Sequence, residues 1–323
     1  MSSLAGLGIS RDYFKLDLGV LRPDRWLFAP GSARRLAAVR IALCLLLALR
    51  VGLRPSLYLD LSQQEASLFR PLSWAKLFDH MPSRGVLLVA LIVCVVAALC
   101  AAAGFKGRIA LPIAWVAGVF VNGFLTSQGK VIHNDVLLLL CMFILIPARH
   151  SDAWSVDAWR RRRRGQAPPP DESVRYGWPV RTAMVLIAFA YCVTGLHKLQ
   201  YTGIAWASSD NLRWVLYTAS DSQNGNSLGL FIANHPLLSH IFAWGTLVVE
   251  CTFPLALLWP VSRWFYVPGV VGMHAGIYAT MHLNYVAMAA TVVIVYVNWG
   301  WIADRLEHRG ESRARLRPAA VRT

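Results

Sequence analysis

The sequence predicts an all-α membrane protein, a polytopic bundle of about eight transmembrane helices around an outward-facing polar chamber. Of its 323 residues, 56% are hydrophobic and only 15% are charged, whereas soluble domains carry about 25% charged residues. The mean hydropathy is +0.46. Apolar runs of about 20 residues recur along the chain, and a run of that length crosses the hydrocarbon of a bilayer as a helix.

The eight expected spans follow one another with short or medium connections. They form a transmembrane domain over 34–305, between an N-terminal arm at 1–33 and a tail at 306–323. The fourth span is the shortest that still crosses a bilayer. The spans are expected at 36–54, 86–103, 107–126, 132–148, 179–199, 237–260, 264–282 and 285–303.

Basic residues set the expected orientation. The net charge is +15, and the lysines and arginines cluster in the arm, in the 149–178 loop with its run Arg160–Arg164 and its prolines, and in the tail. An even number of spans places these segments on one side, which the positive-inside rule makes cytoplasmic, termini included. We therefore expect a multi-pass protein of a bacterial-type cell membrane that contacts lipid and not nucleic acid. A nucleic-acid-binding or lipid-binding patch is the alternative interpretation of the arginine run, which we otherwise expect to be a solvated topology signal followed by a flexible proline hinge.

Two longer connections are then expected to face outward. The connection over 56–85 mixes aromatic and charged residues and is typical of a helix that lies in the membrane interface. The connection over 200–236 has a turn-rich centre. Trp74, Trp206 and Trp214 in these segments suit headgroup depth.

Polar side chains gather in the outer half of the expected bundle. An ionisable group inside a span costs about 2.5–3.5 kcal/mol on insertion scales, so each one is a hypothesis about function. Each also has a plainer interpretation. Lys198 is close enough to the interface to snorkel, and His133, Asn134 and Asp135 suit the cap of a helix. The candidates are Asn122, His133, Asn134, Asp135, His197, Lys198, Glu250, His274 and His282.

Two candidates lie deeper in the expected bilayer. Glu250, near mid-span, must be protonated or paired with a polar group, and His274 is its best partner by depth. His274 also fits a hydrogen-bonded core histidine. Lys198 and His133 are expected to face each other, because each ends or begins a consecutive antiparallel span on the outer side.

Several kinds of chemistry lack their sequence signals. The six cysteines all fall in apolar spans without a CxxC pair, which indicates buried small side chains and no metal site. There is no HExxH motif, no P-loop and no pair of mid-span histidines for heme. A lysine beside an imidazole remains. Desolvation favours the neutral amine, which is a general base, and a site at the bilayer edge suits an amphipathic substrate such as a quinol.

Two segments carry a resemblance to a known family. TSQGKVIHNDVLLLLCMFIL, followed by FAYCVTGLHKLQYTGIAW on the next span, resembles the HTTM module, the transmembrane domain shared by vitamin K-dependent gamma-carboxylase and many bacterial proteins. In the carboxylase a histidine follows two asparagines at one span start, and a Gly-x-Lys-Lys-Leu pattern closes the next. His133 and Lys198 match these positions, and His197 replaces the first lysine. The regions of Glu250 and His274 resemble later spans, so the likeness covers about residues 30–305.

The resemblance implies an activity and its reactants. The family carboxylase uses its lysine to deprotonate reduced vitamin K, a hydroquinone, which then reacts with O₂. The oxidised product removes a proton from a glutamate, CO₂ adds to the carbanion, and the vitamin leaves as its epoxide. Lys198 would be the base and His133 a supporting hydrogen-bonding group, with no metal required. The substrate would be a secreted peptide or protein.

The sequence also departs from the carboxylase. The carboxylase has a large lumenal region after its spans that helps to bind the leader segment of its substrate, whereas this sequence continues for only about 20 residues past the last expected span. The alternative to an enzyme is a membrane factor without catalysis that helps to mature or export a secreted peptide, as some relatives do. A third possibility is a structural subunit that keeps the family core.

Overall fold

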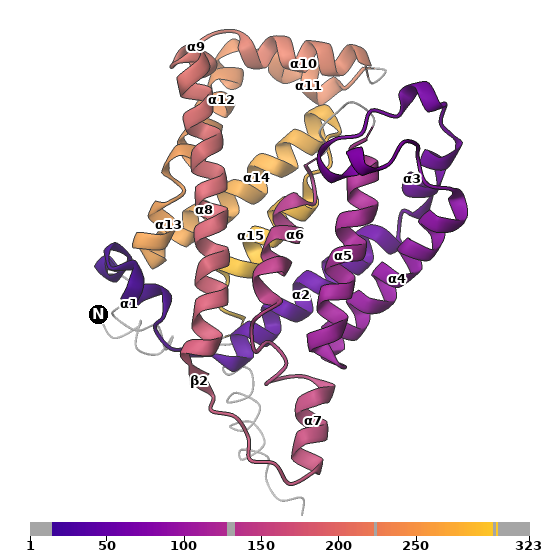
Figure 1. The fold of residues 1–323 in the computed structure, drawn as a ribbon. Helices are drawn as coiled ribbons and strands as arrows, with labels where there is room; N and C mark the ends of the chain where they lie inside the picture. The colour runs from indigo at the N-terminus through magenta and orange to yellow at the C-terminus, as the bar shows by residue number, and fades with distance from the viewer. Residues whose placement is uncertain (1–14, 128–132, 223–224, 300–301, 303–323) are drawn as a thin grey trace, which may run out of the picture.

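The described part of the chain is helical almost throughout, which confirms the all-α bundle. The computed structural model describes residues 15–127, 133–222, 225–299 and 302 (Figure 1). The stretch 128–132, which precedes His133, and the expected tail at 306–323 lie outside these residues. The only strands in the described ranges are β1 (Gly31–Ser32) and β2 (Glu172–Ser173), which pair antiparallel. They hold together the segments that enter α2 (Ala33–Gly52) and α8 (Val174–Thr202).

One half of the bundle is built from α2, α4 (Arg84–Ala103) and α5 (Gly107–Leu125). Serine side chains cap two of these helices: Ser32 Oγ accepts from Arg35 N and Ser83 Oγ from Val86 N, each at 3.4 Å. Gly104 ends α4 at φ 63°, a left-handed conformation that glycine adopts without strain. Leu, Val and Ala side chains of the three helices form a continuous core.

The other half is arranged around α8, whose 29 residues span about 44 Å. It packs against α6 (Val136–Leu145), α12 (Pro236–Thr252) and α15 (Val286–Tyr296). After α12 the chain forms α13 (Leu255–Leu258), η7 (Pro260–Ser262) and α14 (Arg263–Met281). Near the N-terminus, η3 (Leu18–Leu21) and α1 (Pro23–Leu27) come before α2. Figure 1 shows α7 (Val156–Arg163) at one end of the molecule and α10 (Asn211–Ser222) across the other.

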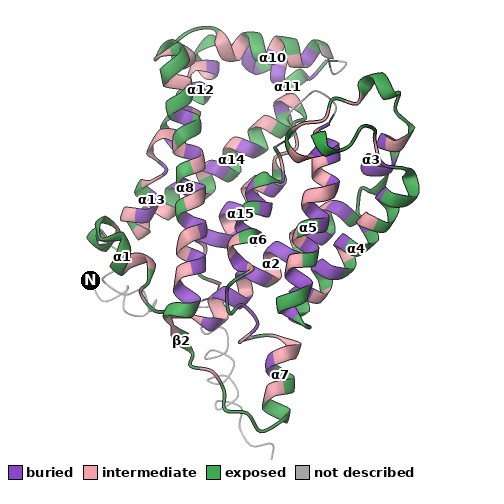
Figure 2. Cartoon of the chain, viewed as in Figure 1, coloured by how far each residue is buried: buried purple, intermediate pink, exposed green. Residues whose placement is uncertain are grey.

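The outer face of α4 is strongly apolar and exposed. Val89, Ile92 and Val96 are 61%, 54% and 55% accessible, and their spacing places them on one stripe of the helix. Figure 2 shows exposed residues along the outer side of α4 and buried residues where the helices face each other. A long exposed apolar stripe is unusual for a soluble monomer. Contact of α4 with membrane lipid would account for it.

Every expected span contains a helix, but not all of these helices are long. In the described residues α4, α5 and α8 are long and apolar enough to cross a membrane. A fourth crossing results if α2 is counted with the segment Pro55–Gln63, which is bent from it by 67°. The helices α6 and α15 are shorter, and the expected span 237–260 is interrupted after Thr252. The total of eight crossings therefore stays a prediction.

The connections differ most from expectation. The 56–85 connection is not one interfacial helix but a series of short turns: α3 (Pro55–Leu59), η4 (Asp60–Gln63), η5 (Ala66–Leu68) and η6 (Ser73–Leu77). Trp74 folds inward there, 5.8 Å from Phe120 between ring centres. The 200–236 connection contains α9 (Ala205–Ser208), α10 and α11 (Ser227–Ala233). In the 149–178 loop, Arg160–Arg163 lie on a helix, α7, and Arg164 is its C-cap.

Candidate functional site

Lys198 and Glu250 form an ion pair between α8 and α12. Lys198 Nζ donates to Glu250 Oε2, and the side chains are 21% and 7% accessible. The helices approach closely because Gly195 faces the contact: a Cβ there would lie 2.7 Å from Cys251 Sγ and 2.8 Å from Cys251 N. The glycine of the sequence TGLHK is thus required by packing. The ring of Trp206 lies over the ammonium, 4.6 Å from Nζ, which adds a cation–π contact.

His274 belongs to a second contact on the same face of α8. Tyr191, two helical turns before Lys198, has its Oη 2.8 Å from His274 Nε2. The expectation that Glu250 is paired is confirmed, but His274 as its best partner is wrong. A lysine can extend along its helix to reach the carboxylate, whereas the histidine is held by the phenol. His274 Nδ1 is buried and has no partner among the described residues.

Tyr285 connects His274 to His133. Its ring centre is 5.3 Å from that of His133 and 5.6 Å from that of His274. His133 is exposed and precedes α6, and Tyr285 lies just before α15. The structure gives no contact between His133 and Lys198 themselves, so their direct pairing stays a prediction. The contacts from His133 run through Tyr285 and His274 to Tyr191, which lies on α8 two helical turns before Lys198.

Asp135 is an ion-pair partner and not a side-chain cap. It stands at the N-cap position of α6 without a capping hydrogen bond from its side chain. Instead Arg50 of α2 binds both carboxylate oxygens, with Nε 2.8 Å from Oδ1 and Nη2 3.1 Å from Oδ2. Arg50 Nη1 also donates to Asn284 Oδ1 at 3.3 Å. A bidentate arginine of this kind fixes geometry as well as charge.

These contacts form three groups: Lys198 with Glu250, the chain of rings from Tyr191 through His274 and Tyr285 to His133, and Arg50 with Asp135 and Asn284. Together these nine residues are the polar network: Arg50, His133, Asp135, Tyr191, Lys198, Glu250, His274, Asn284 and Tyr285. Five were candidates from the sequence. Arg50, Tyr191, Asn284 and Tyr285 were missed. An arginine, amide or tyrosine near a span end is also typical of an interface anchor, and Tyr191, in the middle of its span, is also typical of an aromatic core residue. The nine side chains offer paired charges, two imidazoles and two phenols, a set suited to moving protons.

The remaining candidates have local partners. The Asn122 amide donates to Gly118 O of its own helix at 2.9 Å. His197 is exposed with its ring 4.3 Å from that of Tyr201, and His282 ends α14 at φ 52°. Asn134 is half-buried beside Asp135. In the described ranges no three His, Cys, Asp or Glu side chains converge as a metal site would require.

Comparison with known families gives one match. The HTTM domain matches residues 28–299, which includes every member of the polar network. No curated protein and no solved structure matches the chain significantly. The family match covers most of the sequence, its residues overlap the two segments that first suggested it, and the helical bundle is consistent with it. The chain therefore belongs to the HTTM domain family.

Proposed function

We propose that the polar network is a proton-transfer site in the membrane at which Lys198 removes a proton from the hydroxyl of an amphipathic, quinol-like substrate. The observation that carries the proposal is the Lys198–Glu250 pair. An amine and a carboxylate meet between two helices, beneath an aromatic ring, with the lysine still partly accessible. An ion pair in such a place costs desolvation that a pair of apolar residues would avoid.

The pair gives Lys198 a route to its basic form. In a low-dielectric setting, both charged groups are destabilised relative to their neutral forms. Transfer of one proton from Nζ to Glu250 Oε2 leaves a neutral amine and a neutral acid. The amine can then accept a proton from a substrate hydroxyl, which leaves an ammonium and an oxyanion. Glu250 would hold the proton, and Trp206 would cover the amine and limit its hydration.

The residues present fit a reduced quinone. Trp206, Tyr191 and Tyr285 supply aromatic surface. The buried Nδ1 of His274 has no partner among the described residues, and a hydroxyl group would satisfy it. When bound, a reduced quinone would supply an acidic hydroxyl and the reducing electrons that the family reaction passes to O₂. Lys198 would hold the proton, and His133 would support the site from the α6 side. Carboxylation with CO₂ of a glutamate in a secreted peptide is the form of this chemistry that the family resemblance favours.

The alternative is a membrane factor without catalysis that serves the maturation or export of a secreted peptide. The same ion pair favours it in one respect, because Lys198 and Glu250 already satisfy each other as a structural pair would. The two functions make opposite demands on Lys198. A catalytic base must lose its proton, whereas a structural cation only has to keep its carboxylate partner.

Substitution of Lys198 separates these functions. The native protein, reconstituted with reduced vitamin K, O₂, labelled bicarbonate and a glutamate-containing peptide, should form epoxide and fix label in the peptide. Lys198→Ala and Lys198→Arg should each lower epoxide formation by at least about 100-fold, since general-base catalysis contributes that much and a guanidinium stays protonated. Lys76→Arg, a change at an exposed lysine of η6, is the matched control and should leave the rate unchanged.

Two outcomes contradict the proposal. Full activity in Lys198→Arg would leave Lys198 as a structural cation. No epoxide from the native protein, together with no quinone retained by the detergent-solubilised protein in mass spectrometry, would favour the factor without catalysis. Retained quinone in the native protein that is lost in Lys198→Ala would place the quinone at this site.

A further inference from the structure

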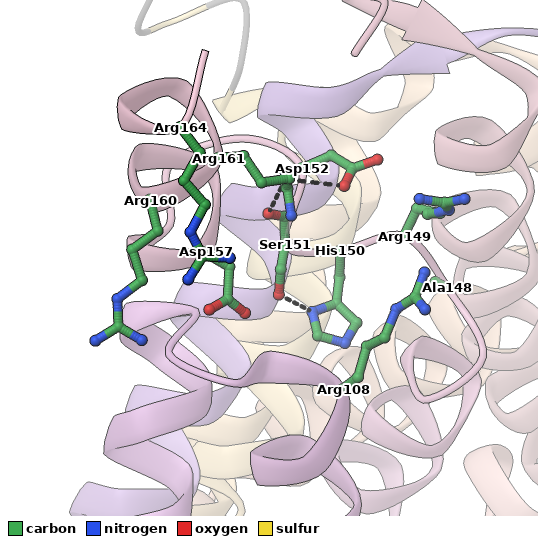
Figure 3. Close-up of a pocket in the computed structure, with 10 residues that line it drawn as sticks. All are labelled: Arg108, Ala148, Arg149, His150, Ser151, Asp152, Asp157, Arg160, Arg161 and Arg164. Atoms are coloured by element: carbon green, nitrogen blue, oxygen red, sulfur yellow. Dashed lines mark hydrogen bonds and ion pairs between the residues drawn. The ribbon is translucent and has the colours of Figure 1, made fainter. Parts of the chain in front are cut away.

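The end of the molecule opposite the polar network contains a cationic cavity that the proposed function does not use. It has a volume of about 290 Å³ and lies between the turn from α4 to α5, the segment after α6, and α7. Five arginines and two aspartates line it, which gives a net charge of +3. Figure 3 shows these side chains around the cavity, with His150 between Ser151 and Arg108. Its volume is close to the lower end of small-ligand pockets, about 300 Å³.

Both aspartates are already committed to other partners. Asp152 binds Arg161 at 3.1 Å and accepts from Tyr176 Oη at 3.0 Å. Asp157 accepts from the backbone N–H groups of Lys106 and Gly107, at 3.1 and 3.0 Å, and so caps α5. One arginine is thereby neutralised. In the described part of the chain, the other four cavity arginines have no carboxylate within 4 Å: Arg108, Arg149, Arg160 and Arg164.

A buried histidine adds a neutral donor to these cations. His150 is 1% accessible, and its Nδ1 lies 3.1 Å from Ser151 Oγ. Burial, with Arg40 and Arg108 nearby, lowers the pKa of His150 to about 4, so the ring is neutral at pH 7. When Ser151 Oγ–H donates to Nδ1, the ring proton is on Nε2. That nitrogen is buried without a partner among the described residues.

Hydrogen bonds from a buried arginine fix the backbone that forms the wall of the cavity. Arg40 of α2 is fully buried, and its guanidinium donates to the carbonyls of His150, Trp154 at 2.7 Å and Ala102 at 3.2 Å. These bonds tie the segment after α6 to α4. The guanidinium of Arg160 is itself positioned, 4.7 Å above the ring of Phe105. A site with fixed donors binds its ligand at a lower entropic cost than a set of free surface arginines.

We propose that this cavity binds a phosphate group, held by Arg108, Arg149, Arg160 and Arg164 with His150 Nε2–H as a neutral donor. Guanidinium groups match phosphate oxygens in shape and charge, and charge-assisted hydrogen bonds to them are among the stronger polar contacts in proteins. The phosphate is either that of an anionic lipid headgroup or free inorganic phosphate. The same end carries the basic segments that the sequence places on the cytoplasmic side, where anionic headgroups are available.

The arginine run contains its own control. Arg160, Arg161 and Arg164 line the cavity, whereas Arg163 stacks its guanidinium 4.0 Å from the ring centre of Trp159 and is not part of the lining. Arg108, Arg163 and Arg164 are all exposed, so replacing them removes little packing. A topology signal or a diffuse basic surface would use Arg163 and Arg164 equally. A phosphate site in the cavity would use Arg164 and not Arg163.

The experiment uses the full chain in nanodiscs. In one arm, nanodiscs of phosphatidylcholine are titrated with inorganic phosphate in a calorimeter. In the other, nanodiscs that also contain phosphatidylglycerol are dissolved, and the lipid retained by the protein is measured by native mass spectrometry. Arg108→Gln and Arg164→Gln should each weaken binding about tenfold, the effect of about 1.4 kcal/mol, and Arg163→Gln should leave it unchanged. Unchanged melting temperatures confirm that the variants fold.

Each arm identifies one source of the phosphate. Saturable binding of inorganic phosphate indicates a site for the free anion, whereas selective retention of phosphatidylglycerol without it indicates a headgroup site. Two results overturn the proposal. One is absence of binding in both arms. The other is equal weakening by Arg163→Gln and Arg164→Gln, which would show that only the overall positive charge of α7 matters.

Discussion

The two ends of the molecule differ in how far their charged side chains are paired. In the polar network each charged side chain meets its counterpart, since Arg50 binds Asp135 and Lys198 binds Glu250. Around α7 the described arginines outnumber the carboxylates that reach them, and the surplus faces a cavity. Pairing is needed where charges are desolvated, whereas surplus cations are stable only beside water or an anion. The contrast therefore separates the proposed proton-transfer site from the proposed phosphate site.

The largest expected effect is in the chemical labelling of cysteines placed at the two ends of the molecule, because each cysteine should be either labelled or not labelled at all. Ser222→Cys lies at the end of α10 and Gln166→Cys lies after α7. If the positive-inside rule holds, a membrane-impermeant thiol reagent added to intact cells should label Ser222→Cys and miss Gln166→Cys. The unsubstituted protein gives the background, because its own cysteines lie in helices of the bundle. Labelling of Gln166→Cys alone would invert the topology and place the polar network on the cytoplasmic side.

The second effect is the loss of one partner of the Lys198–Glu250 pair. Leaving a partly buried charge uncompensated costs about 3–5 kcal/mol, whereas removing both charges costs much less. Glu250→Leu should therefore lower the thermal stability in detergent strongly, and Glu250→Gln less, because the amide still accepts a hydrogen bond. The double variant Lys198→Met/Glu250→Leu should recover most of the loss. Equal stability of Glu250→Gln and Glu250→Leu would show that Glu250 faces water.

The bundle itself was predictable from the sequence, because each apolar run of about 20 residues contains a helix. The interruptions were less predictable. The span expected at 237–260 breaks at Phe253–Pro254, and a proline is a weak signal in a membrane helix, where neighbours can satisfy the freed backbone groups. The helix α7 did have a signal. Ser155 Oγ accepts from Ala158 N at 2.9 Å, and Asp157 and the arginines complement the two ends of the helix dipole.

The candidate site was predictable only in its ionisable members. Lys198, Glu250 and His274 stand out because they are costly in hydrocarbon, but their pairing depends on the geometry of the helices. Depth in the expected bilayer favoured His274 as the partner of Glu250. In the structure, α8 and α12 approach closely at Gly195, and this brings Lys198 to Glu250. Tyr285 lies between the rings of His133 and His274, and Tyr191 is hydrogen-bonded to His274. No sequence pattern distinguishes such tyrosines from interface anchors.

The third effect is a pH dependence of the protein's stability that arises from His150, near α7. Burial lowers the pKa of His150 to about 4, below its ordinary value of 6.5. Below pH 6.5 the unfolded chain therefore binds a proton that the folded protein does not, so stability is present above that pH and falls toward pH 4. Between pH 7 and pH 5 the loss should be about 2 kcal/mol.

A variant isolates the contribution of His150. Melting of His150→Asn in detergent should show a smaller change between pH 7 and pH 5 than melting of the native protein. Bound phosphate would favour protonation of the ring and reduce the native dependence, so the measurement is made in phosphate-free buffer. An identical pH dependence in the variant would assign the effect to other groups.

The smallest effect is expected at an ion pair outside both sites. Arg213 Nη1 lies 3.0 Å from Asp210 Oδ1 on the α10 side, three residues apart, and the Asp210 side chain is 50% accessible. The hydrogen bond that Arg213 donates to this carboxylate raises the pKa of Arg213. The pair faces water, however, where its attraction is screened and is offset by the ordering of the two side chains. Arg213 also keeps its bond from Nε to Ala233 O at 2.8 Å. Asp210→Asn should therefore leave the melting temperature unchanged at low and at high salt. A loss comparable to that of Glu250→Leu would mean that pairing stabilises this protein wherever it occurs, and the contrast between the polar network and the rest of the surface would fail.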